Sequence, residues 1–339
     1  MKKPTLIIIA LLLLSMAQAL VVETGSFRDF LYGEEPACAY DNWISHIAEG
    51  IASANYNLYA PYDRQLNGFG DFRIINALET ANWNALIGLI LTESWDEAEL
   101  MILAAGFPYQ LVQFNDTDTG RTYYMLREIP DMAEIDDNNT ADPYDDESGA
   151  FMYGWGLYIY NPQGSRPVII TVPHPTDDFA TPAMGALALE VWDARFMIIS
   201  GAGREVKWTN VAPFTNSKSL SDPTRVANHP FNFAYDKFAD QIRSQYGLRE
   251  FSAQIHSYDW NRHEGYPNNQ ISAGYQKLCP NLPIRDLSDL NNDMIHQAPH
   301  LVFPANTVGI HAPVYLSDYY SVNYSIHDFN WSDKFSRPY

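Results

Sequence analysis

The chain has 339 residues, with 41 acidic against 21 basic side chains and a formal net charge of −20. This acidic balance argues against nucleic acid or an anionic membrane surface as a partner, because phosphate binding depends on clustered Lys and Arg. Charged residues make up only 18% of the chain and aromatic residues 14%, so the composition predicts a globular protein with a large core and excludes a disordered acidic tail.

A secretory signal peptide is predicted at residues 1–19. Met1-Lys2-Lys3 precedes the apolar run Leu6–Leu14 and the small-residue triplet Ala17-Gln18-Ala19, which is the order typical of such leaders. The apolar run is short for a membrane span, and no later segment approaches the ~20 apolar residues that a membrane helix needs. We expect export to a secreted or periplasmic location, as in a bacterium, without membrane insertion and with a mature chain starting near Leu20. An uncleaved anchor is the alternative.

The two cysteines do not form a disulfide scaffold. Cys38 and Cys279 can pair in an oxidising compartment or remain unpaired and buried, because a sequence does not report their separation. Neither has a Cys or His neighbour at metal-ligand spacing, so neither is a candidate ligand.

Residues 20–150 are predicted to form a helical and β-hairpin N-terminal region. Apolar spacing indicates helices within Asp41–Phe107, and Ser94-x-x-Glu97 is a capping box that opens a helix Trp95–Ala105. Gln110–Phe114 and Arg121–Arg127 flank a polar turn and predict a β-hairpin. The acidic stretch Asp131–Gly149 that follows is predicted to be a surface loop or the boundary between the two regions.

Residues 151–339 are predicted to form an α/β domain, because strand and helix patterns alternate from Phe151 onward. We expect a mainly parallel or mixed sheet with helices on both faces. The predicted strands are Gly156–Tyr160, Val168–Val172, Ala194–Ile199, Glu250–Ile255 and Leu301–Pro304, and the predicted helices are Pro182–Trp192 and Pro230–Tyr246.

Two of these strands end in groups that bind metals. Val168–Val172 is followed by His174, Asp177 and Asp178, and Glu250–Ile255 by His256. Open α/β folds build their sites at the carboxyl edge of the sheet. A zinc ion that activates water needs three protein ligands and an open position. We therefore predict one zinc ion bound by His174, Asp177 and His256, with Asp178 as an orienting partner or base. The alternative is a structural role, with Asp177 capping the next helix and the histidines satisfied at the sheet edge.

Basic and polar residues near these edges are candidates for substrate binding. Arg204 follows the glycine-rich turn after Ala194–Ile199 and can hold a carboxylate or form an ordinary salt bridge. The loop after His256 is rich in polar groups and can line the site. In this loop, we predict that Tyr258 and Arg262 bind the substrate and that Glu264 takes part in catalysis.

Three short motifs resemble those of known metallohydrolases. Ile255-His256-Ser257-Tyr258 looks like the segment carrying the last metal ligand of zinc carboxypeptidases, and His174-Pro-Thr-Asp177 is similar to their His-x-x-Glu with Asp in place of Glu. Ser221-Asp222-Pro223-Thr224-Arg225 resembles the Asp-x-Asn-Arg segment with which carboxypeptidases and N-formylglutamate amidohydrolases bind a substrate carboxylate. The strand before Pro173-His174 is also similar to the Val-Pro-His opening of the amidohydrolases. The motifs fall within roughly residues 151–310.

The resemblance implies a zinc-carboxypeptidase-like fold and hydrolysis of an amide or peptide bond near a free carboxylate, which Arg225 or Arg204 would anchor. Substrates would be peptides, amino-acid amides or cell-wall-type compounds. Such enzymes also need a late carboxylate as general base, but no Glu follows Glu264. Asp178, Glu264 or His311 would have to serve as the base.

Three alternatives stay open. His174-Pro-Thr-Asp-Asp also looks like the His-Pro-Asp-Asp-Glu motif of zinc N-acetylglucosaminyl deacetylases, although Thr176 stands where their base would be. A secreted, non-catalytic binding module for glycan or cell-wall peptide is the second alternative. Calcium is the third alternative: oxygen-bearing side chains lie at EF-hand-like offsets at Asp136, Asn138, Thr140, Asp142 and Glu147, but Ala141 stands where that loop needs Gly.

Overall fold

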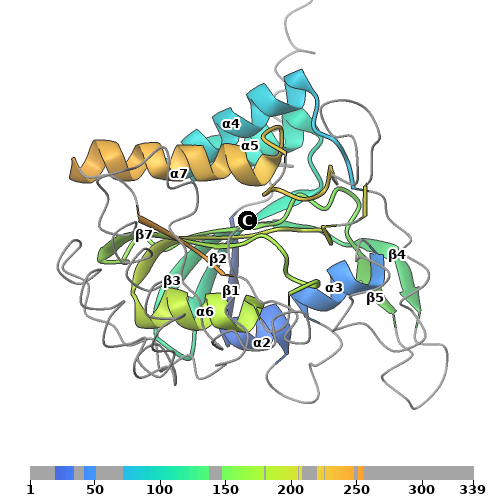
Figure 1. Ribbon diagram of the computed structural model, residues 1–339, viewed down its shortest axis with the longest axis horizontal. Helices are drawn as coiled ribbons and strands as arrows, with labels where there is room; N and C mark the ends of the chain where they lie inside the picture. The colour runs from blue at the N-terminus through green and yellow to red at the C-terminus, as the bar shows by residue number, and fades with distance from the viewer. Residues whose placement is uncertain are drawn as a thin grey trace, which may run out of the picture.

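The computed structural model describes residues 20–33, 42–50, 72–136, 147–178, 181–204, 206–207, 220–224, 226–247 and 251–255. Its centre is a seven-stranded sheet in the order β1-β2-β3-β6-β8-β7-β9 (Figure 1). β1 runs parallel to β2, and β7 runs parallel to both β8 and β9, while the other neighbours are antiparallel. The strands are β1 (Val21–Gly25), β2 (Tyr109–Asp116), β3 (Thr122–Glu128), β6 (Leu157–Tyr160), β7 (Arg166–Val172), β8 (Ala194–Ile199) and β9 (Phe251–Gln254).

Helices cover both faces of this mixed sheet, which confirms the predicted α/β class. α6 contacts β7, β8 and α2 on one face, whereas α7 contacts the same two strands and α4 on the other (Figure 1). Within the described residues, no helix is both long and apolar enough to span a membrane. The helices are α2 (Phe27–Tyr32), α3 (Trp43–Gly50), α4 (Ala77–Leu91), α5 (Trp95–Ala105), α6 (Thr181–Val191) and α7 (Pro230–Tyr246).

The first part of the chain supplies three strands of the same sheet. The predicted hairpin is present as β2 and β3, with Tyr109 opposite Glu128 in the antiparallel register. β1 was not expected from the sequence and extends the sheet by parallel pairing with β2. β4 (Asp131–Asp136) and β5 (Glu147–Ala150) form a separate antiparallel pair within the acidic stretch.

The predicted helix Trp95–Ala105 has the expected bounds but not the expected cap. Ser94 precedes this helix without making a side-chain cap hydrogen bond. The reciprocal capping box lies instead at the start of α4, where Asn76 Oδ1 accepts from the Glu79 backbone N–H and Glu79 accepts from that of Asn76. The predicted capping box at Ser94 and Glu97 is therefore wrong, and the one at Asn76 and Glu79 was not expected from the sequence.

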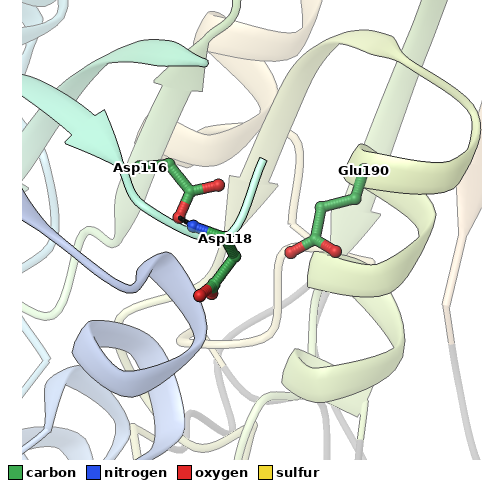
Figure 2. Close-up of side chains that lie close together, drawn as sticks. All are labelled: Asp116, Asp118 and Glu190. Carbon is green, nitrogen blue, oxygen red and sulfur yellow. Dashed lines mark hydrogen bonds between the residues drawn. The ribbon is translucent and has the colours of Figure 1, made fainter. Parts of the chain in front are cut away.

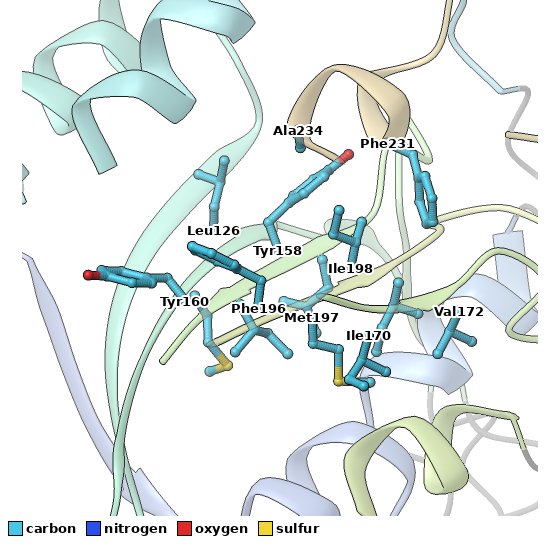
Figure 3. Packing of buried hydrophobic residues seen from close by; sticks show 14 of the residues in the cluster. Leu126, Tyr158, Tyr160, Ile170, Val172, Phe196, Met197, Ile198, Phe231 and Ala234 are labelled. Atoms are coloured by element: carbon cyan, nitrogen blue, oxygen red, sulfur yellow. The ribbon is translucent and has the colours of Figure 1, made fainter. Parts of the chain in front are cut away.

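Nearly every residue of the neighbouring strands β6, β7 and β8 is buried. β7 is flanked by parallel strands and covered by helices on both faces, which explains its unbroken apolar run. α6 packs very close to it: a Cβ added to Gly185 would lie 2.7 Å from both Met197 Cε and Val172 Cγ2. Figure 3 shows Met197 and Val172 on one side of the sheet and Phe231, which belongs to α7, on the other.

The chain reverses its winding direction between β7 and β8. From β7 it passes through α6 to β8, and from β8 it returns through α7 across β7 to reach β9. Because α6 and α7 lie on opposite faces, the loops leaving the carboxyl ends of β7 and β8 diverge. Such a switch point is where open α/β sheets place their ligand crevice. The loops after β7 and β8 contain His174 and Arg204 respectively.

Candidate functional site

A tight turn after β7 brings Asp178 to His174. The Asp178 backbone N–H donates to the His174 carbonyl at 3.1 Å, and the Thr181 hydroxyl at the start of α6 donates to the carbonyls of both residues. This turn places Asp178 Oδ2 3.2 Å from His174 Nδ1. Asp178 therefore contacts the imidazole at Nδ1, and its predicted role as orienting partner of a metal ligand or as base stays a prediction.

A second carboxylate lies on the other ring nitrogen. Asp222 Oδ1 is 3.0 Å from His174 Nε2, and each of the two side chains is 1% exposed. Asp222 is fixed by its own loop, because the Thr224 backbone N–H and hydroxyl both donate to Oδ1, at 2.9 and 2.6 Å. His174 is thus a buried imidazole held between two carboxylates from segments 48 residues apart.

The charges in this triad reinforce one another. Burial alone would lower the pKa of His174, but the carboxylates of Asp178 and Asp222 outweigh it and raise that pKa to about 9. Burial likewise opposes the ionisation of Asp222, yet its hydrogen bonds to His174 and Thr224 lower its pKa to about 2. These contacts describe a protonated imidazole held between the carboxylates of Asp178 and Asp222.

The loop after β8 is tied to the loop after β7. The Arg204 backbone N–H donates to Asp177 Oδ2 at 2.8 Å, and the Arg204 guanidinium lies 3.7 Å from Asp178 Oδ1. Arg204 thus forms an ion pair with Asp178, the ordinary salt bridge that the sequence left open as its alternative role. Asp177 faces this loop, and it is Asp178, one residue later, that contacts the imidazole.

A third loop supports the turn after β8 by direct backbone packing. A Cβ added to Gly201 would lie 2.4 Å from the Gly156 nitrogen and 2.6 Å from the Gly154 carbonyl carbon. Glu128, at the end of β3, holds this third loop by accepting from the backbone N–H groups of Tyr153, Gly154 and Trp155. Glu128 is 1% exposed, and burial raises its pKa to about 7 in spite of these donors.

A second buried histidine lies next to the Asp222 loop and has a structural role. His229 caps α7, with Nδ1 accepting from the Phe231 backbone N–H at 3.2 Å, and its ring stacks on Phe72 at 4.9 Å between centroids. Burial lowers the pKa of His229 to about 4, so its imidazole is neutral at physiological pH.

One further acidic cluster lies away from this edge. Among the described residues, Asp116, Asp118 and Glu190 bring carboxylate oxygens within 4.8 Å of one another (Figure 2). Each already accepts hydrogen bonds from the protein: Asp116 from four donors, Asp118 from Ser26, and Glu190 from the Arg28 guanidinium. This cluster therefore links α2, the β2–β3 turn and α6.

Several predicted site residues lie outside the described residues. They are Arg225, His256, Tyr258, Arg262, Glu264 and His311, together with Cys38, Cys279, the leader 1–19, most of the EF-hand-like loop and the strand Leu301–Pro304. The strand that precedes His256 is nevertheless in place: β9 pairs in parallel with β7, and the Ile255 backbone N–H donates to the Thr171 carbonyl at 2.8 Å.

Two residues of the site were not anticipated from the sequence. Asp222 was noted only as part of the motif containing Arg225, although Asp-x-Thr is a pattern in which a carboxylate accepts from the backbone two residues on. The sequence around Glu128 gave no sign of its role, because the three backbone N–H groups that donate to its carboxylate belong to a loop 25 to 27 residues later.

Comparisons with known proteins return no match: no family model, curated protein or solved structure is significantly similar to the chain.

Proposed function

We propose that this chain is an exported metal-dependent hydrolase that cleaves an amide or peptide bond near a free carboxylate. The observation that carries the proposal is the buried imidazole of His174 at the switch point of the sheet, oriented by Asp178 through Nδ1. A carboxylate behind a ligating imidazole is the usual arrangement in metal sites, because it fixes the tautomer and the ring orientation.

The donor set fits a zinc-type ion. Imidazole nitrogen and carboxylate oxygen are zinc ligands, and here both are buried within hydrogen-bonding distance of each other at His174 Nε2 and Asp222 Oδ1. His256 remains a predicted further ligand. When bound, such an ion lowers the pKa of a water ligand toward ~7 and polarises a substrate carbonyl.

The remaining residues would bind and orient the substrate. The Arg204 guanidinium is 20% exposed beside Asp178 and can hold a substrate carboxylate with charge-assisted hydrogen bonds. Asp177 accepts a hydrogen bond from the Arg204 backbone N–H and so fixes the backbone position from which the Arg204 side chain extends. The resemblance of the short motifs to carboxypeptidases and amidohydrolases supports the choice of an amide bond next to a carboxylate.

A non-catalytic binding module is the second candidate. It is favoured by the fact that both ring nitrogens of His174 already face protein carboxylates, so that a protonated imidazole links the turn after β7 to the Asp222 loop without a metal. In that case the aromatic residues of the chain would serve glycan or peptide binding.

Hydrolysis assays distinguish these functions. The mature protein should hydrolyse members of a panel of N-acyl amino acids and short peptides, lose that activity on chelation and regain it when zinc is restored. An N-acetyl sugar in the same panel tests the deacetylase alternative. Arg204→Ala should raise KM for carboxylate-bearing substrates at least about tenfold, as expected for a lost charge-assisted contact. Failure to hydrolyse any of the panel, with or without zinc, would favour the binding module.

A further inference from the structure

We infer that the outer face of helices α4 and α5 is the surface through which two copies of this chain form a dimer. The inference does not depend on the proposed hydrolysis. The two helices contact each other on the α7 side of the sheet (Figure 1). Their outer face exposes three leucines: Leu78 on α4 is 71% exposed, and Leu100 and Leu103 on α5 are 42% and 53% exposed. Neighbouring exposed apolar residues of this size mark interaction sites.

Helix α4 is apolar on its outer as well as its inner side. The inner side supplies four buried residues to the core, Trp83, Leu86, Ile87 and Ile90. On the outer side Leu78, Ala81 and Ala85 follow the helical spacing and are exposed. Glu79 is the one charged residue among the 15 of this helix, and its side chain is engaged in the capping box and an ion pair with Arg73.

A helix that is apolar all round is normally covered by protein or crosses a membrane. With 15 residues, α4 is shorter than the ~20 that a membrane span needs. Helices that lie on a membrane surface carry Lys and Arg beside their apolar face, whereas the first turn of α5 exposes Asp96 and Glu97. We therefore assign this face to a protein partner.

The charges at the two ends of the face are of opposite sign. Arg73, whose side chain is 45% exposed, precedes α4 at one end. Glu93, in the turn between the helices, and Asp96 and Glu97 are exposed at the other end. At 1.5 Å per residue, α4 separates these ends by about 22 Å. The apolar residues of the face lie between them.

A second copy complements this pattern. If the α4 helices of two copies cross antiparallel about a two-fold axis between Ala81 and Ala85, Arg73 of each copy approaches the acidic end of the other, and symmetry forms this contact twice. Leu78 of each copy then packs near the small side chain of the partner's Ala85. The chain has a formal net charge of −20, so two copies repel each other on average, and a nearly uncharged face opposes their association least.

Sedimentation of the mature protein, residues 20–339, across a concentration series tests the dimer. The wild type should dimerise, and Leu78→Asp should weaken the dimer more than about 100-fold, because two charges enter the apolar contact. Asp suits the first turn of a helix, so this variant should fold. Val22→Asp, at a residue 61% exposed on β1, is the matched control and should dimerise as the wild type does. A monomeric wild type, or equal dimerisation of Leu78→Asp and the wild type, would overturn the inference.

A charge exchange tests the antiparallel arrangement. Arg73→Glu should weaken the dimer about tenfold, because two attractive contacts become repulsive. Adding Asp96→Lys and Glu97→Lys to this variant should restore most of the loss, since opposite charges again face each other across the two-fold axis. A triple variant that dimerises no better than Arg73→Glu would overturn this arrangement.

Vesicle flotation distinguishes a second copy from a lipid surface. The wild type should not float with phosphatidylcholine vesicles, with or without an anionic lipid. Flotation of the wild type that is lost in Leu78→Asp would identify lipid as the occupant of this face and overturn the dimer.

Discussion

The backbone N–H of Arg204 donates a 2.8 Å hydrogen bond to Oδ2 of Asp177, joining the loops that follow two adjacent parallel strands. These loops lead to helices on opposite faces of the sheet, so this hydrogen bond fixes the position of one loop relative to the other. The stability of that contact therefore bears on the whole site.

Removing the acceptor at Asp177 should destabilise the fold. Asp177→Ala leaves the Arg204 N–H without this partner and should lower the free energy of unfolding by about 1–3 kcal/mol. Asp177→Asn keeps an acceptor oxygen and should cost less than about 1 kcal/mol. Urea unfolding of the metal-free proteins measures both values, and equal losses for the two variants would show that the hydrogen bond contributes little.

Backbone packing behind the turn after β8 predicts a contrast between two glycines. Gly201→Ala places a Cβ 2.4 Å from the Gly156 nitrogen, where only main chain could move, and should lower the free energy of unfolding by at least about 2 kcal/mol. Gly88→Ala lies in helix α4 with nothing within 4 Å of the new Cβ and should stabilise by about 0.5–1 kcal/mol. Thermal unfolding of the two variants gives the comparison. A Gly201→Ala protein as stable as wild type would contradict the observed packing.

Glu128 should make stability depend on pH. Because burial raises its folded pKa to about 7, above the ordinary value of 4.5, the folded state holds its proton more tightly than the unfolded state does. The resulting stabilisation is fully present below pH 4.5 and is lost as the pH rises through about 7. The total loss is about 3 kcal/mol, from 1.36 kcal/mol for each pKa unit.

The matched variant for this effect is Glu128→Gln. Its amide does not titrate, so the wild type should lose stability relative to the variant between pH 4.5 and above 7, whatever constant offset the amide introduces. Chemical unfolding across this range measures the difference. A difference that does not change with pH would mean that the folded and unfolded states have the same pKa for Glu128.

The cluster of Asp116, Asp118 and Glu190 should contribute to stability through hydrogen bonds that need no bound metal. Asp116 is buried and accepts from the Phe27, Asp118 and Thr119 backbone N–H groups and from the Thr119 hydroxyl. Asp116→Ala should therefore cost about 3 kcal/mol, because it leaves several donors unsatisfied. Asp118→Ala, at an exposed position with one bond to Ser26, should cost less than about 1 kcal/mol. Calorimetry of both variants checks the order, and a larger loss for Asp118→Ala would contradict it.

The sequence predicted the α/β class and the placement of His174 because both depend on local patterns. A buried strand such as β7 is a continuous apolar run, and the polar residue that ends it marks the sheet edge. The hairpin of β2 and β3 was likewise visible from its turn. β1 was not, since an edge strand paired in parallel with a strand more than 80 residues later leaves no local signature.

The partners of His174 could not be derived from spacing alone. A turn can present either the third or the fourth following residue, and here the hydrogen bond from the Asp178 N–H to the His174 carbonyl selects the fourth. Asp222 reaches the ring from 48 residues away, through the return of the chain after β8. Tertiary packing, which the sequence pattern does not encode locally, decides both contacts.

The zinc stoichiometry of the purified mature protein tests the metal site most directly. The wild type should bind about one zinc ion per chain after dialysis, and His174→Ala should retain none, because a neutral methyl replaces the imidazole ligand. Asp118→Asn, in the separate acidic cluster, should keep the wild-type stoichiometry. A folded wild type without stoichiometric zinc, or a His174→Ala protein that binds as much as the wild type, would contradict a metal centre at His174.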